Sequence, residues 1–362
     1  MRQKNSRVVE VVMRVLQISS DRSKRGILFP GTPAFQRQEA YAKQFGNLDI
    51  IGFSRKSDGA QEYRDEQLRV IPTNSRSRLS YGFDGIGIAN RLPRPDVVTV
   101  QDPFETGLVA WWIARKFNVP LHVQVHTDFL SPEYARLSFW NRVRVWIARF
   151  VLRHATHIRV VSERTKCSIE ERYKLLAPII VMPIFVNVAK FKAADLADPS
   201  GLRSKYRLLL LVVARNAPEK NIALAIKAFE KSAPHDAGLI ICSDTEEGDL
   251  ESRRIHFVRL EPIQLYKNVD LVLVPSKYEG YGLVTVEALA SGKPVLSTDV
   301  GIAREAGAIV TTEEKFSDSL AEWFKKGPRT GALKSYPYES FDEYVRAYCV
   351  DTLACAKSQK SE

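Results

Sequence analysis

Short runs of β-branched and aliphatic residues alternate with longer amphipathic segments along the 362 residues of this chain. Such alternation is typical of parallel β-sheets whose strands are joined by crossover helices. The strands predicted in the first half are 15–19, 49–53, 97–101, 121–125, 158–161 and 179–182. The strands predicted in the second half are 208–213, 238–242, 255–258, 271–274 and 295–298. We therefore expect an α/β protein.

The chain is long enough for two domains with separate cores. The polar and alanine-rich stretch 189–204 lacks strand alternation, and we interpret it as a linker. We expect one Rossmann-like domain over residues 13–188 and a second over residues 205–338. A further helical segment is expected within residues 339–362.

A glycine-rich loop follows the apolar run 271–274, which is predicted to be a buried parallel strand. A helix is expected over 283–291, directly after this loop, and Gly292 ends it. Glycines let the backbone approach a ligand closely, and the free N–H groups at the start of a helix suit an anion such as a pyrophosphate. The residues expected to bind this ligand are Gly280, Tyr281, Gly282 and Leu283.

Two glutamates flank that loop with seven residues between them: Glu279 precedes the expected helix, and Glu287 lies inside it. Carboxylates accept hydrogen bonds from sugar hydroxyls, so loop and glutamates together predict a nucleotide-sugar site. The simpler interpretation is that Glu279 favours a helix start and Glu287 is solvated. Because Val286 and Ala288 give Glu287 apolar neighbours in sequence, where a charge needs a partner, we favour the binding role.

Other polar residues also follow predicted strands. Arg215 and Lys220 come after the first strand of the second half, and His126 and Asp128 come after 121–125. Open α/β sheets bind ligands at the C-terminal ends of their strands, so these side chains are expected to line a cleft between the domains. Taken singly, each could equally be an ordinary surface or loop residue.

A helix is also expected over residues 33–45, with Thr32 as its N-cap and Pro33 as its first residue. Gly31, just before it, would leave room for a phosphate or an acceptor, so we include it among the donor-binding residues.

These motifs together resemble those of retaining glycosyltransferase family 4, whose members have the GT-B fold, in which two Rossmann-like domains face each other across a central cleft. Glu279 and Glu287 match the E-x7-E motif of the family. Arg215 and Lys220 stand in its diphosphate-binding positions, and His126 belongs to a strand ending in His-x-Asp. The resemblance extends over nearly the whole chain, including residues 160–163, 182–187, 212–221 and 292–301.

The resemblance implies that a hexosyl group passes from a nucleoside diphosphate sugar to an acceptor hydroxyl, with retention of anomeric configuration. The two basic residues would stabilise the leaving diphosphate. Glu279 would bind the donor sugar, Glu287 the ribose diol, and Asp128 the acceptor, while His126 would orient the sugar. The residues assigned to catalysis are His126, Arg215, Lys220 and Glu279. The resemblance also implies that the segment 341–356 crosses back to the N-terminal, acceptor-binding domain.

No Asp-x-Asp pair of the kind that holds a divalent ion follows a predicted strand, so we expect neither a metal nor another cofactor.

Two other functions stay open. The chain could be a non-catalytic, glycosyltransferase-like subunit that binds sugar or assists a partner, or it could be a GT-B sugar-nucleotide epimerase. Ala214 stands where the family usually has glycine, and 241–248 lacks the usual glycine-rich turn. Because Arg215, Lys220, Glu279 and Glu287 are all present despite these departures, we favour the transferase, with the sugar and the base unassigned.

The formal net charge is +11, from 53 Lys and Arg against 42 Asp and Glu, which suggests an anionic partner. Residues 136–153 hold five arginines and no acid. If they form a helix, one face carries Arg142, Trp146, Arg149 and Arg153, and another carries Trp140, Val143, Ile147 and Val151.

Such a helix could lie on anionic lipid, or its apolar face could pack in the N-terminal core. We expect an acceptor that is lipid-linked or a cell-envelope glycan. We expect no nucleic acid, because no recognised nucleic-acid-binding module is present.

No apolar run approaches the roughly 18 residues needed to span a bilayer, and the first residues lack a signal-peptide pattern. We therefore expect a cytoplasmic protein, peripheral at the inner face of the membrane if it meets a lipid-linked acceptor.

The four cysteines are expected to be reduced thiols, because they have neither metal-ligand spacing nor the density of a secreted scaffold. Residues 1–12 are expected to be a disordered extension.

Overall fold

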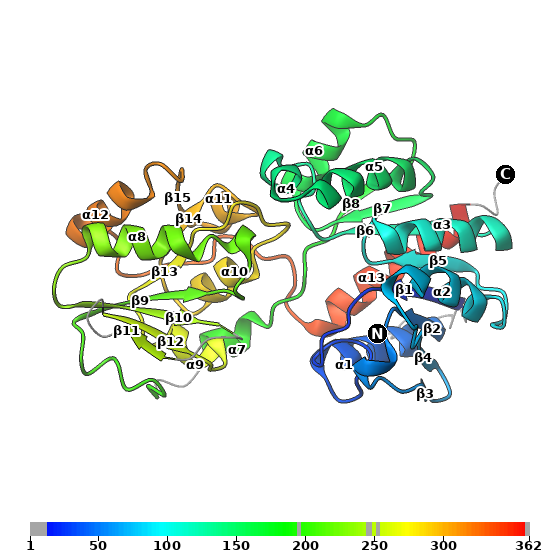
Figure 1. Cartoon of the computed structure of the whole chain (residues 1–362), viewed down its shortest axis with the longest axis horizontal. Coiled ribbons are helices and arrows are strands. Elements are labelled where there is room, and N and C mark those ends of the chain that lie inside the picture. Colours follow the sequence, from blue (N-terminus) through cyan, green and yellow to red (C-terminus); the bar gives the residue numbers. More distant parts are fainter. Residues whose placement is uncertain (1–12, 194–196, 244–247, 251–253, 359–362) are drawn as a thin grey trace, which may run out of the picture.

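The computed structural model describes residues 13–193, 197–243, 248–250 and 254–358, so the extension predicted over residues 1–12 lies outside it. Two α/β domains lie side by side, each built around a mostly parallel sheet (Figure 1). This arrangement confirms the predicted fold class.

The N-terminal sheet has the strand order β3-β4-β2-β1-β5-β6-β7-β8. Only the pairing of β3 with β4 is antiparallel within this sheet, as far as the structure describes it. The strands are β1 (Met13–Ser19), β2 (Gly46–Gly52), β3 (Tyr63–Arg64), β4 (Leu68–Pro72), β5 (Val97–Val100), β6 (Leu121–Val125), β7 (His157–Val160) and β8 (Ile179–Val181).

Helices cover both faces of this sheet, because successive residues of a buried strand point to opposite faces and both sets need partners. One face packs against α3 and α5, and the other packs against α1 and the last helix, α13. The helices are α1 (Pro33–Phe45), α2 (Tyr81–Ala89), α3 (Glu105–Phe117), α4 (Pro132–Leu137), α5 (Phe139–Arg153) and α6 (Glu163–Arg172), with short 3-10 helices η1 (Lys56–Asp58) and η2 (Arg78–Ser80).

The C-terminal sheet has the order β11-β12-β10-β9-β13-β14-β15. Its strands are β9 (Leu208–Val213), β10 (Ala237–Cys242), β11 (Gly248–Leu250), β12 (Ile255–Val258), β13 (Leu271–Val274), β14 (Val295–Thr298) and β15 (Ile309–Thr311). Its helices are α8 (Ile222–Ser232), α9 (Pro262–Tyr266), α10 (Leu283–Ala290), α11 (Ala303–Ala306) and α12 (Phe316–Lys326), with the 3-10 helix η3 (Pro218–Lys220). Phe229 of α8 and Trp323 of α12 fill the core on one face, and Tyr266 and Leu289 fill the core on the other.

All eleven predicted strands are present, with ends that differ by a few residues. The strands that the prediction missed, β3, β4, β11 and β15, are short strands at or next to the sheet edges, where the apolar signal is weakest. The helix expected over 33–45 is α1, and the Thr32 hydroxyl accepts a hydrogen bond from the Phe35 N–H at 3.1 Å, as expected for an N-cap. The stretch interpreted as a linker contains the short helix α7 (Val188–Lys192).

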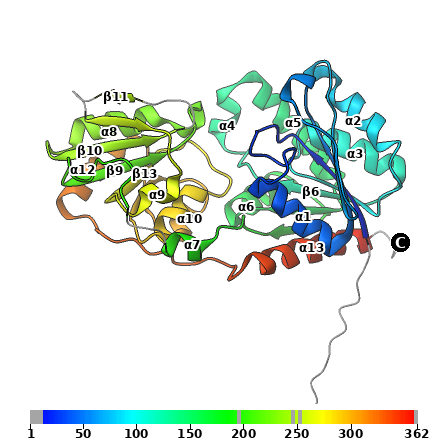
Figure 2. The ribbon, with the colours of Figure 1, turned by 90° about the horizontal axis from the view of Figure 1, so that it is seen from below.

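The last helix, α13 (Phe341–Ser358), leaves the C-terminal domain and packs on the N-terminal one, where Figure 2 shows it beside α1. The ring of Tyr348 lies 4.3 Å from that of Tyr41, between centroids, and 6.0 Å from that of Phe45. Two chain crossings therefore join the domains (Figure 1).

Most of the arginine-rich segment 136–153 forms α5, which packs on the core through Ala148, Val151 and Leu152, whereas Arg136 lies on α4. The face predicted to carry Trp140 and Val151 packs in the core only in part, since Val151 is buried and 68% of Trp140 is exposed. Only the second half of α5 packs closely on the sheet, so the aromatic residues of its first half stay at the surface.

In the described part of the chain, no helix is long and apolar enough to span a membrane. Cys167 is exposed, and the other three cysteines are buried free thiols.

The docking of α13 can be tested on two valines of that helix. Val345 is buried against the N-terminal core, whereas 65% of Val350 is exposed. Val345→Ala is expected to lower the free energy of unfolding by about 2 kcal/mol, because two buried methyl groups are lost and a cavity remains. Val350→Ala is expected to change it by less than about 0.5 kcal/mol. Urea denaturation measures both, and equal effects would contradict the docked position of α13.

Candidate functional site

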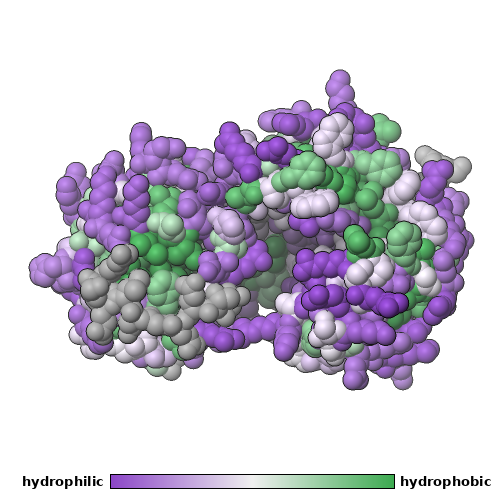
Figure 3. Space-filling model, viewed as in Figure 1, coloured by the Kyte–Doolittle hydropathy of each residue, from purple (hydrophilic) through white to green (hydrophobic). Residues whose placement is uncertain are grey.

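A pocket of about 990 Å³ opens between the two domains, and Figure 3 shows the hollow between them. The N-terminal domain contributes the loop after β1 and His126, which follows β6. The C-terminal domain contributes Arg215, after β9, and the loop after β13. The pocket thus lies at the C-terminal ends of strands from both sheets, where open α/β sheets bind ligands.

A lysine and a glutamate form an ion pair at one end of the pocket. Lys220 Nζ lies 2.6 Å from Glu279 Oε1, and the Ser276 hydroxyl donates to the same oxygen at 2.8 Å. The two charged side chains are only 20% and 16% exposed. Their partial burial strengthens the charge-assisted contact and holds both groups in place.

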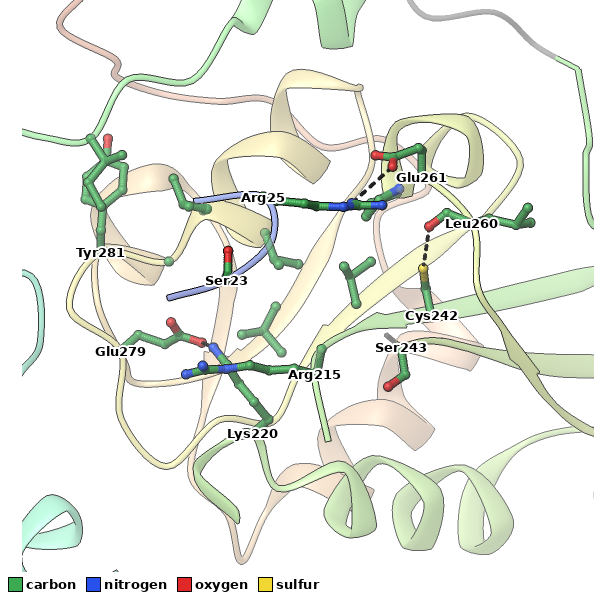
Figure 4. Close-up of a pocket in the computed structure, with 18 of the residues that line it drawn as sticks. Ser23, Arg25, Arg215, Lys220, Cys242, Ser243, Leu260, Glu261, Glu279 and Tyr281 are labelled. Carbon is green, nitrogen blue, oxygen red and sulfur yellow. Dashed lines mark hydrogen bonds and ion pairs between the residues drawn. The ribbon is translucent and has the colours of Figure 1, made fainter. Parts of the chain in front are cut away.

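Arg215 lies beside Lys220 at this end of the pocket (Figure 4). Its side chain is 68% exposed and pairs with Glu219 Oε1 at 3.0 Å. At the other end of the pocket, Arg25 of the N-terminal domain pairs with Glu261 of the C-terminal domain at 3.2 Å. Basic side chains outnumber carboxylates in the lining by five to two, which suits a ligand with several negative charges. The five are Lys24, Arg25, Arg215, Lys220 and Arg259, and the two are Glu261 and Glu279.

The glycine-rich loop is where the two domains touch. A Cβ atom on Gly280 would lie 1.9 Å from the carbonyl oxygen of His126, so no larger residue fits without moving one backbone. The Ser162 hydroxyl of the N-terminal domain donates to the Gly280 carbonyl at 2.9 Å. Gly282 has a φ of 100°, in the left-handed region that favours glycine, and α10 starts directly after it. Gly282, Leu283 and Val284 line the pocket, so α10 begins at the pocket wall.

His126 lines the pocket, and its Nε2 lies 3.2 Å from Gln124 Oε1. Burial lowers the pKa of His126 to about 3, with further contributions from the positive charges of Arg159 and Arg37. The ring is therefore neutral at physiological pH.

Glu287 lies one turn into α10, where the Tyr266 hydroxyl donates to its Oε2 at 2.8 Å. Burial raises the pKa of Glu287 to about 7, and the hydrogen bond from Tyr266 partly offsets that rise. This carboxyl group is therefore poised to change its charge near neutral pH.

Two family models match the chain in succession. Residues 39–190 match the model described as Glycosyltransferase Family 4, and residues 196–328 match the one described as Glycosyl transferases group 1. The chain belongs to the family 4 type of GT-B glycosyltransferases.

Curated relatives of this family are similar at low identity. The chain is 24% identical over 282 residues to an alpha-monoglucosyldiacylglycerol synthase of Streptococcus pneumoniae, which covers 68% of this chain and 63% of the relative. It is 26% identical over 211 residues to an alpha-D-kanosaminyltransferase of Streptomyces kanamyceticus, which covers 52% of this chain and 55% of that relative. The matched part is thus less than two thirds of either relative's length.

Solved GT-B structures agree in fold. HepE of Anabaena, solved in complex with UDP and glucose, superposes with a TM-score of 0.63 at 17% identity, covering 96% of this chain and 98% of HepE. Sucrose-phosphate synthase of Thermosynechococcus elongatus superposes with a TM-score of 0.67 at 17% identity, with the same coverage.

The structure brings most of the residues predicted from the family 4 resemblance into one pocket. The predicted residues that line it are His126, Arg215, Lys220, Glu279, Gly280, Tyr281, Gly282 and Leu283. Three others do not line it. Glu287 lies behind the loop on α10, Asp128 is buried beside the domain contact, and Gly31 is exposed at the start of α1.

Sequence reasoning missed the basic residues that the loop after β1 brings to the pocket, Lys24 and Arg25. It also missed Arg259 and Glu261, which follow β12. One signal was present in the sequence, because all four follow predicted strands in the same way as Arg215 and His126. No group of three or more His, Cys, Asp or Glu side chains within the described residues could hold a metal ion, and metal independence stays a prediction.

The raised pKa of Glu287 predicts a pH-dependent stability. Because its pKa is about 7 in the folded protein against 4.5 ordinarily, the folded state holds this proton more tightly than the unfolded state. Stability is therefore lost as pH rises from the ordinary pKa through the folded one, on the order of 3 kcal/mol in all. Glu287→Gln removes the charge, so its unfolding free energy relative to wild type should rise over this pH range.

Urea denaturation of both proteins at several pH values measures this difference. Glu322→Gln, at an exposed position of α12, is the control, and its difference from wild type is expected to stay constant. A difference for Glu287→Gln that does not change with pH would contradict the burial of an ionisable carboxyl group at this position.

Proposed function

We propose that this protein is a retaining, metal-independent glycosyltransferase that moves a hexosyl group from a nucleoside diphosphate sugar to an acceptor hydroxyl. The observation that carries the proposal is the Lys220–Glu279 pair beside the first turn of α10. This arrangement sets a cation and helix N–H groups next to a carboxylate, as a ligand with a diphosphate and a sugar requires. The UDP and UDP-glucose named with HepE, a protein of the same fold, support a donor of this kind.

Departure of the diphosphate is the difficult step. As the bond between the anomeric carbon and the β-phosphate oxygen breaks, negative charge grows on that phosphate. Lys220 and Arg215 would stabilise this charge, together with the N–H groups of the first turn of α10. The acceptor oxygen would then bond to the anomeric carbon on the same face, and its proton would pass to the departing phosphate oxygen. No separate general base is needed in this scheme.

Glu279 would accept hydrogen bonds from the donor sugar, since its carboxylate is held at the pocket wall by Lys220 and Ser276. The neutral ring of His126, on the opposite domain, would orient the same sugar. Glu287 would reach the ribose diol from behind the glycine loop, and its ionised form is the better acceptor for two hydroxyls. Asp128 and Gly31 do not line the pocket, so they would contribute only to acceptor binding or to the shape of the loops at the pocket entrance.

The donor site is tested by thermal stabilisation with UDP-, GDP-, ADP- and TDP-sugars in the presence of EDTA. One nucleotide series is expected to raise the melting temperature, and Lys220→Ala is expected to abolish the rise because the diphosphate loses its cation. Lys227→Ala, which removes the same charge from an exposed site on α8, is the control and should retain it. No stabilisation by any donor would overturn the proposal.

Transfer itself is followed by product NMR, and an unchanged anomeric configuration is the expected result. Stabilisation by a donor without transfer to any acceptor would favour a sugar-binding accessory subunit instead. Conversion of the donor into an isomeric sugar nucleotide would favour an epimerase.

We further propose that the acceptor is lipid-linked, or a cell-envelope glycan, and is met at an anionic membrane surface. The name of the Streptococcus pneumoniae relative, an alpha-monoglucosyldiacylglycerol synthase, supports a lipid acceptor. The surface of α5 supports membrane contact, because Trp140 and Trp146 are 68% and 71% exposed amid arginines. Exposed Phe83 of α2 and Trp112 of the neighbouring α3 extend this apolar and basic surface. Attachment to the inner face of the membrane is part of this proposal.

Flotation with vesicles tests the membrane surface. Binding is expected to increase with the fraction of anionic lipid and to fall at least about tenfold in the double variant Arg142→Ser, Arg149→Ser, at roughly 1 kcal/mol for each charge near the surface. The control is Lys325→Ser, Lys326→Ser, which removes two exposed charges from α12 of the other domain and should change little. Equal binding to neutral and anionic vesicles would contradict the proposed membrane contact.

A further inference from the structure

The N-terminal sheet turns a row of buried polar side chains toward α13, where apolar residues would be expected. His122, Gln124 and Arg159 come from β6 and β7, and Thr99 comes from the neighbouring β5. All four are at most 3% exposed. Burying so many polar groups costs stability unless each finds a partner, so the pattern of their hydrogen bonds matters.

Arg159 decides how the amide of Gln124 is oriented. Arg159 Nη1 lies 2.9 Å from Gln124 Oε1, and a guanidinium can only donate, so this atom must be the amide oxygen. The same oxygen lies 3.2 Å from His126 Nε2. An amide oxygen can only accept, so His126 Nε2 carries the hydrogen. The neutral ring of His126 then keeps Nδ1 as its acceptor.

The amide nitrogen of Gln124 is held from the other side by groups that reach α13. Gln124 Nε2 donates to the Tyr348 hydroxyl of α13 at 3.0 Å and to Thr99 Oγ1 at 3.2 Å. Thr99 Oγ1 lies 2.9 Å from His122 Nδ1. His122 Nε2 lies 3.0 Å from the carboxylate of Asp351, also on α13.

The two ends of this chain of hydrogen bonds are chemically unambiguous. Asp351 accepts at one end. Burial raises the pKa of its carboxyl group, but the contact with His122 and the charges nearby outweigh burial, so the pKa lies below its ordinary value. Arg159 donates at the other end, and it also donates to the Tyr344 hydroxyl of α13 at 3.1 Å. Arg159 therefore fixes the orientation of the Gln124 amide, and Asp351 makes His122 Nε2 a donor.

We propose that Gln124 is a positioning residue for His126, which holds the ring as the Nε2–H tautomer with Nδ1 as its acceptor, and that the docking of α13 holds Gln124 in turn. The proposal rests on the proposed function in one respect, namely that His126 faces the transferred sugar. It assigns His126 the role of accepting a hydrogen bond from a sugar hydroxyl at Nδ1. A proton-donating role through Nε2 is excluded, because that hydrogen is engaged by Gln124.

The tautomer is measured first, on the full chain with 15N-labelled histidine and no donor present. The signals of His126 are those missing from the spectrum of His126→Asn. The wild-type protein is expected to show a protonated Nε2 and an unprotonated Nδ1 at neutral pH. Gln124→Leu is expected to give a mixture of tautomers, whereas a spectrum unchanged by this substitution would overturn the proposal.

Gln17→Leu is the matched control, because Gln17 is as deeply buried and lies on β1, in register with Thr99 of β5, the strand that separates β1 from β6. It is expected to leave the His126 signals as in wild type. If Gln17→Leu changes them as much as Gln124→Leu does, the effect is one of general packing and the proposal fails. If Gln124→Leu does not fold, Gln124→Asn serves instead, since its shorter side chain keeps the amide but withdraws it from His126.

The second measurement is transfer kinetics. Gln124→Leu is expected to lower kcat by about 10- to 100-fold with the donor KM changed by less than about threefold, because a misoriented group affects the reaction more than binding. Gln17→Leu is expected to keep kcat within about threefold. Equal kcat values for Gln124→Leu and wild type would overturn the proposal. If the protein transfers no sugar at all, the proposed function fails, while the tautomer measurement still decides the position of His126.

Discussion

The contact between Gly280 and the His126 carbonyl is the constraint on which the site depends. It brings the backbone of the C-terminal domain's glycine loop against the end of β6 in the N-terminal domain, with no room for a side chain. The Ser162 hydroxyl holds the Gly280 carbonyl, and Arg164 donates to the Gly301 carbonyl at 3.1 Å. The pocket is therefore complete only when the two domains meet, which joins domain closure to the assembly of the site.

The two walls of this pocket differ in charge. The wall of the C-terminal domain carries the partly buried Lys220–Glu279 pair, which suits a diphosphate next to a sugar. The wall of the N-terminal domain carries a neutral histidine, held at the end of a buried polar network that reaches α13. The helix α13, which follows the second crossing, thus supports the N-terminal wall by hydrogen bonds as well as by packing.

Most of the fold and much of the site could be predicted from the sequence. The central strands are continuous apolar runs, because both of their faces are buried, and they were found for that reason. Lys220, Glu279 and the glycine loop were found because open α/β sheets bind ligands at the C-terminal ends of such strands. The edge strands β3 and β15 were missed because they have only two and three residues, and β4 was missed although four of its five residues are buried. Lys24 and Arg25 were missed because only Gly31 was assigned to the site from the loop after β1, and the basic residues earlier in that loop were not considered.

The sequence by itself determined which residue types follow which strands, and therefore the chemical character of the pocket. Where a strand ends along the chain is a local property, and so is the identity of the residues that follow it. The tertiary structure alone decided how these residues are used. Burial, which depends on what packs around Glu287 and His126, sets their charge states near neutral pH. Two partners of Gln124 are distant in the sequence: Thr99 lies 25 positions away and Tyr348 lies 224 positions away. No local pattern could therefore reveal them. The requirement for glycine at position 280 could not be predicted locally either, because the atom that leaves no room for a side chain there belongs to the other domain.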